Sequence, residues 1–213
     1  MANKYYDVLR APHQVAFDIT NNCNLRCLHC FNSSGENDVI SNELSDGEVL
    51  HFMEDLASMN LYNVCFCGGE TLLRKELMCE CIKILKPSGS HCTAVTNGLL
   101  ANPATIQQLA SAGLDGIQFS LDGLRDSHER LRNKVGIFPK VIDAMKYVLN
   151  ETELRLSIAF TPTSFNVKDF LGVYDLLVDL YKKSNRTTGS DYIDFRLQPL
   201  MLLGRAKDNP NIV

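Results

Sequence analysis

Short apolar runs alternate with longer segments of helical period along most of the chain. The apolar runs predict six strands, at residues 15–19, 63–67, 91–95, 116–121, 153–160 and 191–200. Between them, apolar residues that recur every three or four positions predict five helices, at about residues 46–59, 74–85, 103–112, 138–149 and 169–183. This alternation predicts an α/β fold, in which a parallel sheet is joined by right-handed crossovers.

Residues near the predicted helix ends support these boundaries. Ser45 is expected to cap the helix that begins at Asp46, and Pro103 lies in the first turn of its helix. Gly113 is expected just past the end of that helix. On the helix at residues 169–183, the inward face is expected to carry Leu171, Leu176, Leu177 and Leu180.

The sixth strand has no predicted helix after it. Six strands with outer helices correspond to a six-stranded part of a (βα)8 barrel, either partly closed or open. We therefore predict a partial (βα)6 TIM barrel over residues 15–207, preceded by a lead-in at residues 1–14. Residues 208–213 are expected to begin a further C-terminal region, since a sheet without its closing helix would keep an apolar face uncovered.

The composition of the 213 residues is ordinary for a soluble globular protein, with 45% hydrophobic and 22% charged residues and a net charge of -4. Such a balance does not indicate a nucleic-acid or lipid surface. The N-terminus lacks the apolar segment of a signal peptide, and no apolar run is long enough to cross a bilayer. We expect a cytoplasmic protein with no nucleic-acid or membrane partner.

Eight cysteines lie between positions 23 and 92, and three of them have the spacing C-x3-C-x2-C, at Cys23, Cys27 and Cys30. Without an export signal, reduced thiols that bind metal or pack in a core are favoured over disulfides. A mononuclear zinc site usually has four ligands, and His29 directly precedes Cys30, so the two are poor partners on one ion. In a [4Fe–4S] cluster, three thiolates would leave one iron open to a small molecule that carries its own donors.

The other five cysteines are expected to be small buried hydrophobic residues. Cys65 and Cys67 are expected to face opposite sides of their strand. Cys79 and Cys81 are expected on different faces of a helix. We therefore predict no second cluster from these residues.

Four motif-like turns follow predicted strand ends: the cysteine loop, GGE at residues 68–70, TNG at residues 96–98 and SLDG at residues 120–123. The carboxyl ends of parallel strands meet at one edge of a sheet, which is where barrel enzymes and open α/β sheets place their sites. The four turns therefore predict a single functional site at this edge.

These motifs resemble those of the radical S-adenosylmethionine (SAM) superfamily. The resemblance extends from about Val15 to Lys207, and rests on CNLRCLHC, CGGETLL, TNG, SLDG, HERLR and PLMLLGRA. The GRA segment after the sixth strand resembles the SPASM/twitch group, which includes maturases of ribosomally made peptides and relatives that act on haem precursors. Thr71 replaces the proline of the usual GGEP motif, which is expected to change loop stiffness more than ligation.

The resemblance implies that Cys23, Cys27 and Cys30 ligate a [4Fe–4S] cluster whose open iron binds SAM. One electron from the cluster then cleaves SAM to a 5′-deoxyadenosyl radical, which abstracts a hydrogen from the substrate. The implied SAM-binding residues are His29, Gly68, Gly69, Glu70, Thr96, Asn97, Ser120, Asp122 and Arg132. Arg130 competes with Arg132 for the SAM carboxylate, and a structural role in the turn is the alternative for Asp122. Residues 199–201 are expected to supply an apolar wall for adenine.

The leading hypothesis for the substrate is a peptide or protein side chain that undergoes cross-linking, oxidation or another maturation step. A small molecule such as a haem or tetrapyrrole precursor is the alternative, and a structural zinc-binding module is a remote one. The resemblance also implies a flavodoxin-like or ferredoxin-like electron donor. SPASM/twitch proteins carry auxiliary clusters on later cysteines, whereas no cysteine follows Cys92 here. Either such clusters are missing, or the chain is a fragment, which we favour.

Overall fold

The computed structural model describes residues 12–36, 42–186 and 194–213. Six parallel strands form one sheet in the order of the chain, so each strand pairs with the next one. The strands are β1 (Gln14–Thr20), β2 (Asn63–Gly68), β3 (His91–Thr96), β4 (Gly116–Ser120), β5 (Arg155–Phe160) and β6 (Asp194–Leu197). The predicted partial barrel is confirmed. The first three residues of the predicted sixth strand, 191–193, lie outside the described residues.

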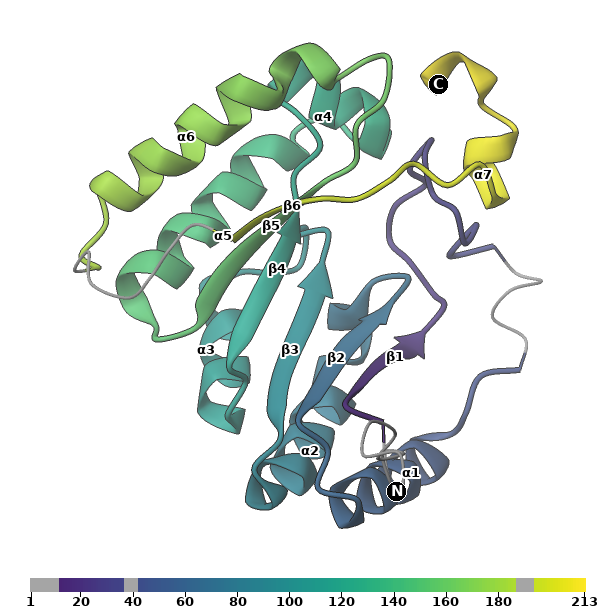
Figure 1. Ribbon diagram of the computed structural model, residues 1–213, viewed down its shortest axis with the longest axis vertical. Helices are drawn as coiled ribbons and strands as arrows, with labels where there is room; N and C mark the ends of the chain where they lie inside the picture. The colour runs from purple at the N-terminus through teal and green to yellow at the C-terminus, as the bar shows by residue number, and fades with distance from the viewer. Residues whose placement is uncertain (1–11, 37–41, 187–193) are drawn as a thin grey trace, which may run out of the picture.

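Helices follow the strands along the outer side of the curved sheet (Figure 1). Consecutive strand order combined with right-handed crossovers places the connecting helices on the same face of the sheet. The helices are α1 (Asp46–Ser58), α2 (Lys75–Leu85), α3 (Pro103–Ala112), α4 (Arg125–Arg132), α5 (Ile137–Glu151), α6 (Phe170–Lys182) and α7 (Gly204–Lys207). Short 3-10 turns are η2 (Thr71–Arg74), η3 (Lys86–Ser88), η4 (Val167–Asp169) and η5 (Pro210–Ile212). Within the described ranges, no helix has the length and apolar character of a membrane span.

The five predicted helices are confirmed, whereas α4 and α7 were not predicted. Helix α4 has the sequence RDSHERLR, in which a single leucine cannot produce an apolar period. Helix α7 is only four residues long. The predicted cap of α1 is confirmed, because the Ser45 hydroxyl accepts from the Glu48 backbone N–H and the Glu48 carboxylate accepts from the Ser45 N–H, at 2.9 Å.

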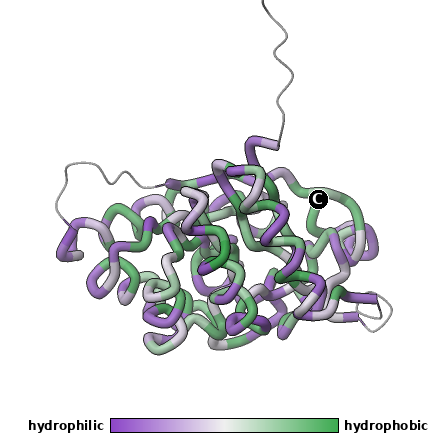
Figure 2. The backbone as a smooth tube through the Cα atoms, turned by 90° about the horizontal axis from the view of Figure 1, so that it is seen from below, coloured by the Kyte–Doolittle hydropathy of each residue, from purple (hydrophilic) through white to green (hydrophobic). Residues whose placement is uncertain are grey.

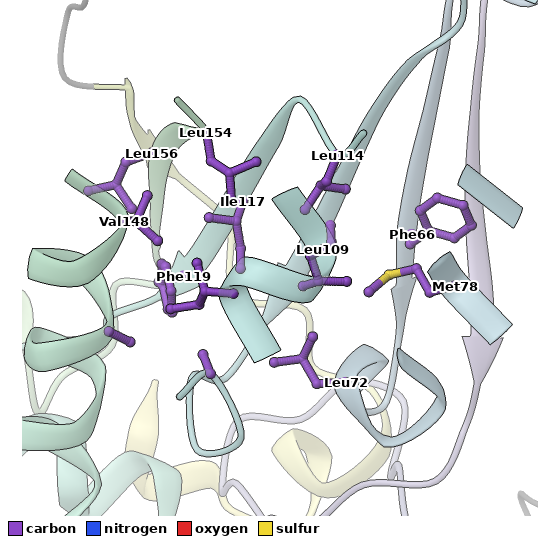
Figure 3. Close-up of a cluster of buried hydrophobic side chains, with 14 of the residues drawn as sticks. Phe66, Leu72, Met78, Leu109, Leu114, Ile117, Phe119, Val148, Leu154 and Leu156 are labelled. Carbon is purple, nitrogen blue, oxygen red and sulfur yellow. The ribbon is translucent and has the colours of Figure 1, made fainter. Parts of the chain in front are cut away.

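The apolar core fills the space between the sheet and the helices. Phe66, Met78, Leu109 and Phe119 are fully buried there (Figure 3). Along the chain, hydrophobic and hydrophilic residues alternate at short intervals, as expected of amphipathic elements around such a core (Figure 2).

One predicted inward residue of α6 is wrong. Leu171 is 70% exposed, whereas Val173, Leu177 and Leu180 are buried. The buried positions follow the spacing i, i+4, i+7 of one helix face, and Leu171 falls outside that stripe.

The predicted orientation of Cys65 and Cys67 is also wrong. Both residues are partly exposed, whereas Val64 and Phe66 of the same strand are buried in the core. Residues two positions apart on a strand point to the same face, so the two cysteines lie side by side on the inner face of the sheet. Their Sγ atoms are 3.5 Å apart. The prediction of buried, core-packed cysteines is confirmed for Cys79, Cys81 and Cys92.

Candidate functional site

A cavity of about 480 Å³ lies at the carboxyl ends of the strands. We call it the carboxyl-end cavity, and its volume falls in the range of about 300–1,000 Å³ that is typical of small-molecule sites. Among its lining residues are most of those predicted from the sequence: Cys23, Cys27, His29, Cys30, Gly68, Gly69, Thr96, Asn97, Ser120 and Arg132. The predicted residues Glu70 and Asp122 lie behind its wall, at 0% and 1% exposure.

The cysteine loop after β1 is folded around the side chain of Arg26. The Arg26 guanidinium donates to the Cys23 carbonyl at 2.8 Å, to the Leu25 carbonyl at 2.9 Å and to the Gly35 carbonyl. Gly35 has a φ of +85°, and a Cβ there would meet the Arg26 guanidinium at 2.2 Å. The two ends of the loop are thereby held close together by one guanidinium group.

The C-terminal segment packs against the same loop. In Figure 1, the yellow segment that contains α7 lies beside the loop that follows β1. Arg205 donates from Nε to the Cys27 carbonyl at 3.1 Å and from a terminal nitrogen to the Ser34 carbonyl at 3.2 Å. Gly204, with a φ of +50°, lies so close that a Cβ would meet the Phe31 carbonyl oxygen at 2.5 Å. Sequence reasoning used GRA only as a family signature, since no local pattern reveals a contact between residues this far apart in the chain.

The three loop thiols differ in their exposure. Cys27 is 7% exposed, whereas Cys23 and Cys30 are partly exposed. Burial raises the pKa of Cys27 to about 11, although the neighbouring Arg132 opposes this shift. Burial also raises the pKa of Cys23. Both thiols therefore hold their protons at neutral pH unless a metal displaces them.

The chemistry of these thiols suits an iron–sulfur cluster. Among the described residues, no group of three or more His, Cys, Asp or Glu side chains converges in a way that could hold one metal ion. The ligands of a cuboidal [4Fe–4S] cluster each bind a separate iron, so they do not have to converge on one point. Thiolate is the ligand that such clusters take.

Arg132 and Asp122 form a buried ion pair beside the thiols. The Arg132 guanidinium lies 2.5 Å from the Asp122 carboxylate and donates to the Cys27 sulfur at 3.8 Å. His29 Nε2 lies 3.3 Å from the same carboxylate. Burial opposes the ionisation of Asp122, but Arg132 and His29 outweigh it and hold the pKa of Asp122 well below its usual range. A cation is thereby fixed against Cys27, the most deeply buried of the three loop thiols.

The two candidate arginines lie in different places. Arg132 lines the carboxyl-end cavity, whereas the guanidinium of Arg130 lies over the ring of Phe165, 3.7 Å from its centroid. His128 accepts from the Asp122 backbone N–H at 3.1 Å, and burial lowers the pKa of His128 to about 3. His128 is therefore a neutral support for the turn that carries Asp122.

Glu70 joins the ends of β2 and β3 rather than facing the cavity. Its carboxylate accepts from the Thr96 hydroxyl at 2.6 Å, from the Leu72 N–H at 3.1 Å and from the Asn97 N–H at 2.9 Å. Burial raises the pKa of Glu70, although these hydrogen bonds oppose the shift. Its own backbone N–H donates to the Asn22 carbonyl at 2.8 Å, which links the turn to the cysteine loop.

The two glycines before Glu70 are required by the same close packing. A Cβ on Gly68 would meet the Thr20 carbonyl oxygen at 2.2 Å, and one on Gly69 would meet the Asn22 carbonyl oxygen at 2.2 Å. Gly68 also has a φ of +134°. Sequence reasoning expected the glycines to admit a ligand, and the structure shows that they first admit the backbone of the cysteine loop.

The cavity wall offers both polar and apolar partners to a ligand. Two buried nitrogens of lining residues, Nδ1 of His29 and Nε of Arg132, have no hydrogen-bond partner within the described part of the chain. Pro199 and Met201 supply apolar wall, as predicted, whereas Leu200 packs against a separate small cluster. Lining residues that the sequence did not single out include Asp18, Cys67, Thr161 and Gln198. The donor set fits a cluster together with a polar, nucleoside-containing molecule.

Comparison with known proteins gives consistent matches. Residues 17–177 match the family model described as "Radical SAM superfamily". The Fe-coproporphyrin III synthase of Methanosarcina barkeri is 31% identical over 163 residues, which cover 76% of this chain and 40% of that protein. The sporulation killing factor maturation protein SkfB of Bacillus subtilis is 27% identical over 164 residues, which cover 77% of this chain and 39% of that protein.

Solved structures agree on the fold. The crystal structure of Streptococcus suis SuiB bound to S-adenosylmethionine has a TM-score of 0.69 at 18% identity, and the match covers 89% of this chain and 41% of SuiB. The matched segment spans 40% of the Fe-coproporphyrin III synthase and 48% of the AdoMet-dependent heme synthase of Methanosarcina barkeri. At this identity, the likeness to SuiB concerns the fold alone.

Proposed function

The chain belongs to the radical SAM superfamily, and on this premise we propose that it forms the core of an enzyme that uses a [4Fe–4S] cluster and SAM. The observation that carries the proposal is the carboxyl-end cavity, where three loop thiols, the glycine turn after β2 and Ser120 meet. When bound, the cluster and SAM supply the one-electron cleavage that yields a 5′-deoxyadenosyl radical, which abstracts a hydrogen from the substrate.

Within this proposal, the residues of the chain hold and orient the reactants. Cys23, Cys27 and Cys30 hold the cluster. Arg132 places a positive charge beside Cys27, which favours the thiolate that a cluster needs. Asp122 is a positioning residue, because it fixes Arg132 and His29 without reaching the cavity.

We assign the SAM contacts to groups that line the cavity. The backbone of Gly68 and Gly69, with Thr96, Asn97 and Ser120, supplies polar atoms at the strand ends. Glu70 acts through Thr96 and Asn97, to which it is hydrogen-bonded. Pro199 and Met201 give the apolar surface on which adenine would lie.

Anaerobic reconstitution with iron and sulfide tests this assignment. We expect a brown protein with a broad visible absorbance that cleaves SAM to 5′-deoxyadenosine and methionine when dithionite supplies electrons. A flavodoxin-like or ferredoxin-like protein, the proposed natural donor, should replace dithionite. A colourless protein that binds zinc and leaves SAM intact would contradict the proposal and support a structural zinc module.

For the substrate, we propose a side chain of a peptide or protein. Relatives support this choice, since SkfB and the mycofactocin maturase MftC are named as maturation proteins, and SuiB has been solved with its precursor peptide SuiA. The second candidate is a small molecule of the tetrapyrrole class. It is supported by the 31% identity to the Fe-coproporphyrin III synthase.

The two substrate classes can be separated by coupled turnover. The probes are Fe-coproporphyrin III and the product of any short precursor-peptide gene beside the gene of this protein. We expect the peptide to raise the yield of 5′-deoxyadenosine and to lose hydrogen itself. Stimulation and conversion of Fe-coproporphyrin III instead would favour the tetrapyrrole assignment.

A further inference from the structure

The two cysteines of β2 form a second thiol site. The Sγ atoms of Cys65 and Cys67 are 3.5 Å apart, and both side chains are partly exposed on the inner face of the sheet. The remaining strand and helix cysteines, Cys79, Cys81 and Cys92, are buried in the apolar core. Cys65 and Cys67 are therefore the two thiols outside the cysteine loop, within the described residues, that small molecules can reach.

The pair stands between two cavities. Cys67 lines the carboxyl-end cavity, together with the loop cysteines. Cys65 lines a smaller cavity of about 120 Å³ nearer the amino ends of the strands, which we call the amino-end cavity. Its wall includes Thr93, Gln118 and Arg196. A reactant in either cavity meets one of the two sulfur atoms.

The surroundings divide the two thiols into a nucleophile and a proton-bearing neighbour. Hydrogen bonding from Cys67, with help from the Thr93 hydroxyl and the charge of Arg196, lowers the pKa of Cys65 to about 6, against burial and the charge of Asp18. The same interaction and burial raise the pKa of Cys67. The first proton of the pair is therefore lost easily and the second with difficulty. At neutral pH, Cys65 supplies a thiolate, which is the reactive form of cysteine.

The backbone geometry allows the two sulfurs to join. At a rise of about 3.3 Å per residue, Cα atoms two positions apart on a strand lie roughly 6.6 Å from each other. This is close to the upper end of the range of about 4.4–6.8 Å that is usual for disulfides. A bridge here would form with limited movement, and its strain would make it easy to reduce again.

We propose that Cys65 and Cys67 form a redox-active dithiol, which exchanges with small-molecule disulfides and closes into a reversible bridge along β2. The Cys65 thiolate attacks one sulfur of the disulfide RSSR, forms a mixed disulfide and releases one thiolate RS⁻. Cys67 then loses its proton, and its sulfur attacks the Cys65 sulfur and releases the second RS⁻. Both RS⁻ groups take up protons, so two protein thiols are oxidised by two electrons and RSSR is reduced to two RSH.

This proposal does not depend on the cluster, since it uses neither the cysteine loop nor SAM. It does place a two-electron couple on the wall of the carboxyl-end cavity. Failure of cluster assembly and failure of dithiol exchange are read by different measurements, namely iron and sulfide content for the first and peptide mass for the second.

The sequence provides a clean way to detect the bridge. Cleavage after Glu54 and Glu70 releases a peptide of residues 55–70, in which Cys65 and Cys67 are the only cysteines. The anaerobically reconstituted protein is incubated with 2-hydroxyethyl disulfide and 2-mercaptoethanol at stepped ratios, quenched with acid, alkylated and digested. We expect a growing share of the peptide to escape alkylation as the ratio of disulfide to thiol rises, at the mass of the dithiol less two hydrogen atoms. The reduced peptide carries two alkyl groups instead, and this form should return when thiol is added before alkylation.

Single variants test which sulfur attacks. In Cys67→Ser, we expect a mercaptoethanol adduct to accumulate on Cys65, because the resolving thiol is missing. In Cys65→Ser, adduct formation on Cys67 should be at least about tenfold slower at neutral pH, because burial still raises the pKa of Cys67 when the Cys65 thiol is gone. Cys92→Ala, which changes a core cysteine of the neighbouring strand, is the control that should still form the bridge.

Three results would overturn the proposal. The first is a wild-type peptide of residues 55–70 that stays in the dithiol form in 2-hydroxyethyl disulfide without added thiol. The second is a stable adduct on wild-type Cys65 that does not close into a bridge. The third is an adduct on Cys67 in Cys65→Ser that forms as fast as the adduct on Cys65 in Cys67→Ser.

Discussion

The two groups of thiols are positioned in different ways. Distant parts of the chain hold the loop that carries Cys23, Cys27 and Cys30. The alternation of side chains along β2 sets the relative position of Cys65 and Cys67. The loop receives hydrogen bonds from Arg26 within it and from Arg205 at the far end of the chain. The strand is paired with β1 and β3, and its Val64 and Phe66 side chains pack in the core.

A close spacing of cysteines has different consequences on a strand and on a loop. On a strand, C-x-C brings two thiols together on one face, where they interact with each other. On a loop, C-x3-C-x2-C leaves the arrangement of the thiols to tertiary contacts, which suits ligands that bind separate atoms of a larger group. The first arrangement favours thiol exchange, and the second favours a cluster.

The largest expected effect separates the two groups of thiols directly. Cys27→Ala should lose nearly all bound iron and sulfide after reconstitution, because two thiolates hold a cuboidal cluster poorly. Cys65→Ser should keep the iron and sulfide content of the wild type, since its sulfur faces the amino-end cavity. Iron and sulfide assays with the visible spectrum measure both. Equal loss of iron and sulfide in the two variants would contradict the separate roles of the loop thiols and the strand thiols.

Glu70→Ala tests whether the stability of the turns after β2 and β3 depends on one buried carboxylate. The change leaves the Thr96 hydroxyl and the N–H groups of Leu72 and Asn97 without their acceptor. We expect the free energy of unfolding to fall by about 4 kcal/mol, as measured by urea denaturation.

Glu76→Ala is the matched control for this substitution. The Glu76 side chain is 70% exposed on the following helix, so its loss should change the free energy of unfolding by less than about 0.5 kcal/mol. A Glu70→Ala protein as stable as this control would show that the Glu70 carboxylate does not stabilise the turns after β2 and β3.

Arg205→Ala should release the loop from the C-terminal segment. Its guanidinium donates to two loop carbonyls and pairs with Glu36 at 2.7 Å. We expect stability to fall by about 2 kcal/mol and cluster content to fall with it, while the dithiol of β2 keeps its exchange with 2-hydroxyethyl disulfide. Lys207→Ala, an exposed neighbour, is the control for loss of a positive charge. Loss of dithiol exchange in Arg205→Ala would contradict the independence of the two thiol groups.

The sequence predicts local elements of the fold better than contacts between distant segments. The strands and five helices follow from local period and caps, so their positions were predictable. Helix α4 was not predicted because its buried residues do not form an apolar stripe. These residues are Ser127, His128 and Leu131. The roles of Glu70 and Arg205 depend on contacts between distant segments, which no local pattern contains.

The misplaced residues have simpler causes. The orientation of Cys65 and Cys67 was predictable, because residues i and i+2 of a strand share a face, and the expectation of opposite faces misapplied that rule. Leu171 shows that hydrophobicity alone does not place a residue inward, since the buried stripe of α6 is set by Val173, Leu177 and Leu180. The loop thiols were identified through a family resemblance, and their surroundings only through the structure.

The smallest expected effect concerns the hydroxyl beside the strand thiols. Thr93 lies next to Cys65 in the sheet register, and its hydroxyl helps to lower the pKa of Cys65. Thr93→Val keeps the shape of the side chain and removes that donor, so less Cys65 is thiolate near neutral pH. We expect the rate of Cys65 alkylation by iodoacetamide at pH 6.5 to fall by roughly threefold. Cluster content should stay unchanged, because the Thr93 hydroxyl does not act on the loop thiols. A rate equal to that of the wild type would show that the Thr93 hydroxyl does not contribute to the reactivity of Cys65. The low pKa of Cys65 would then be due to Cys67 and Arg196.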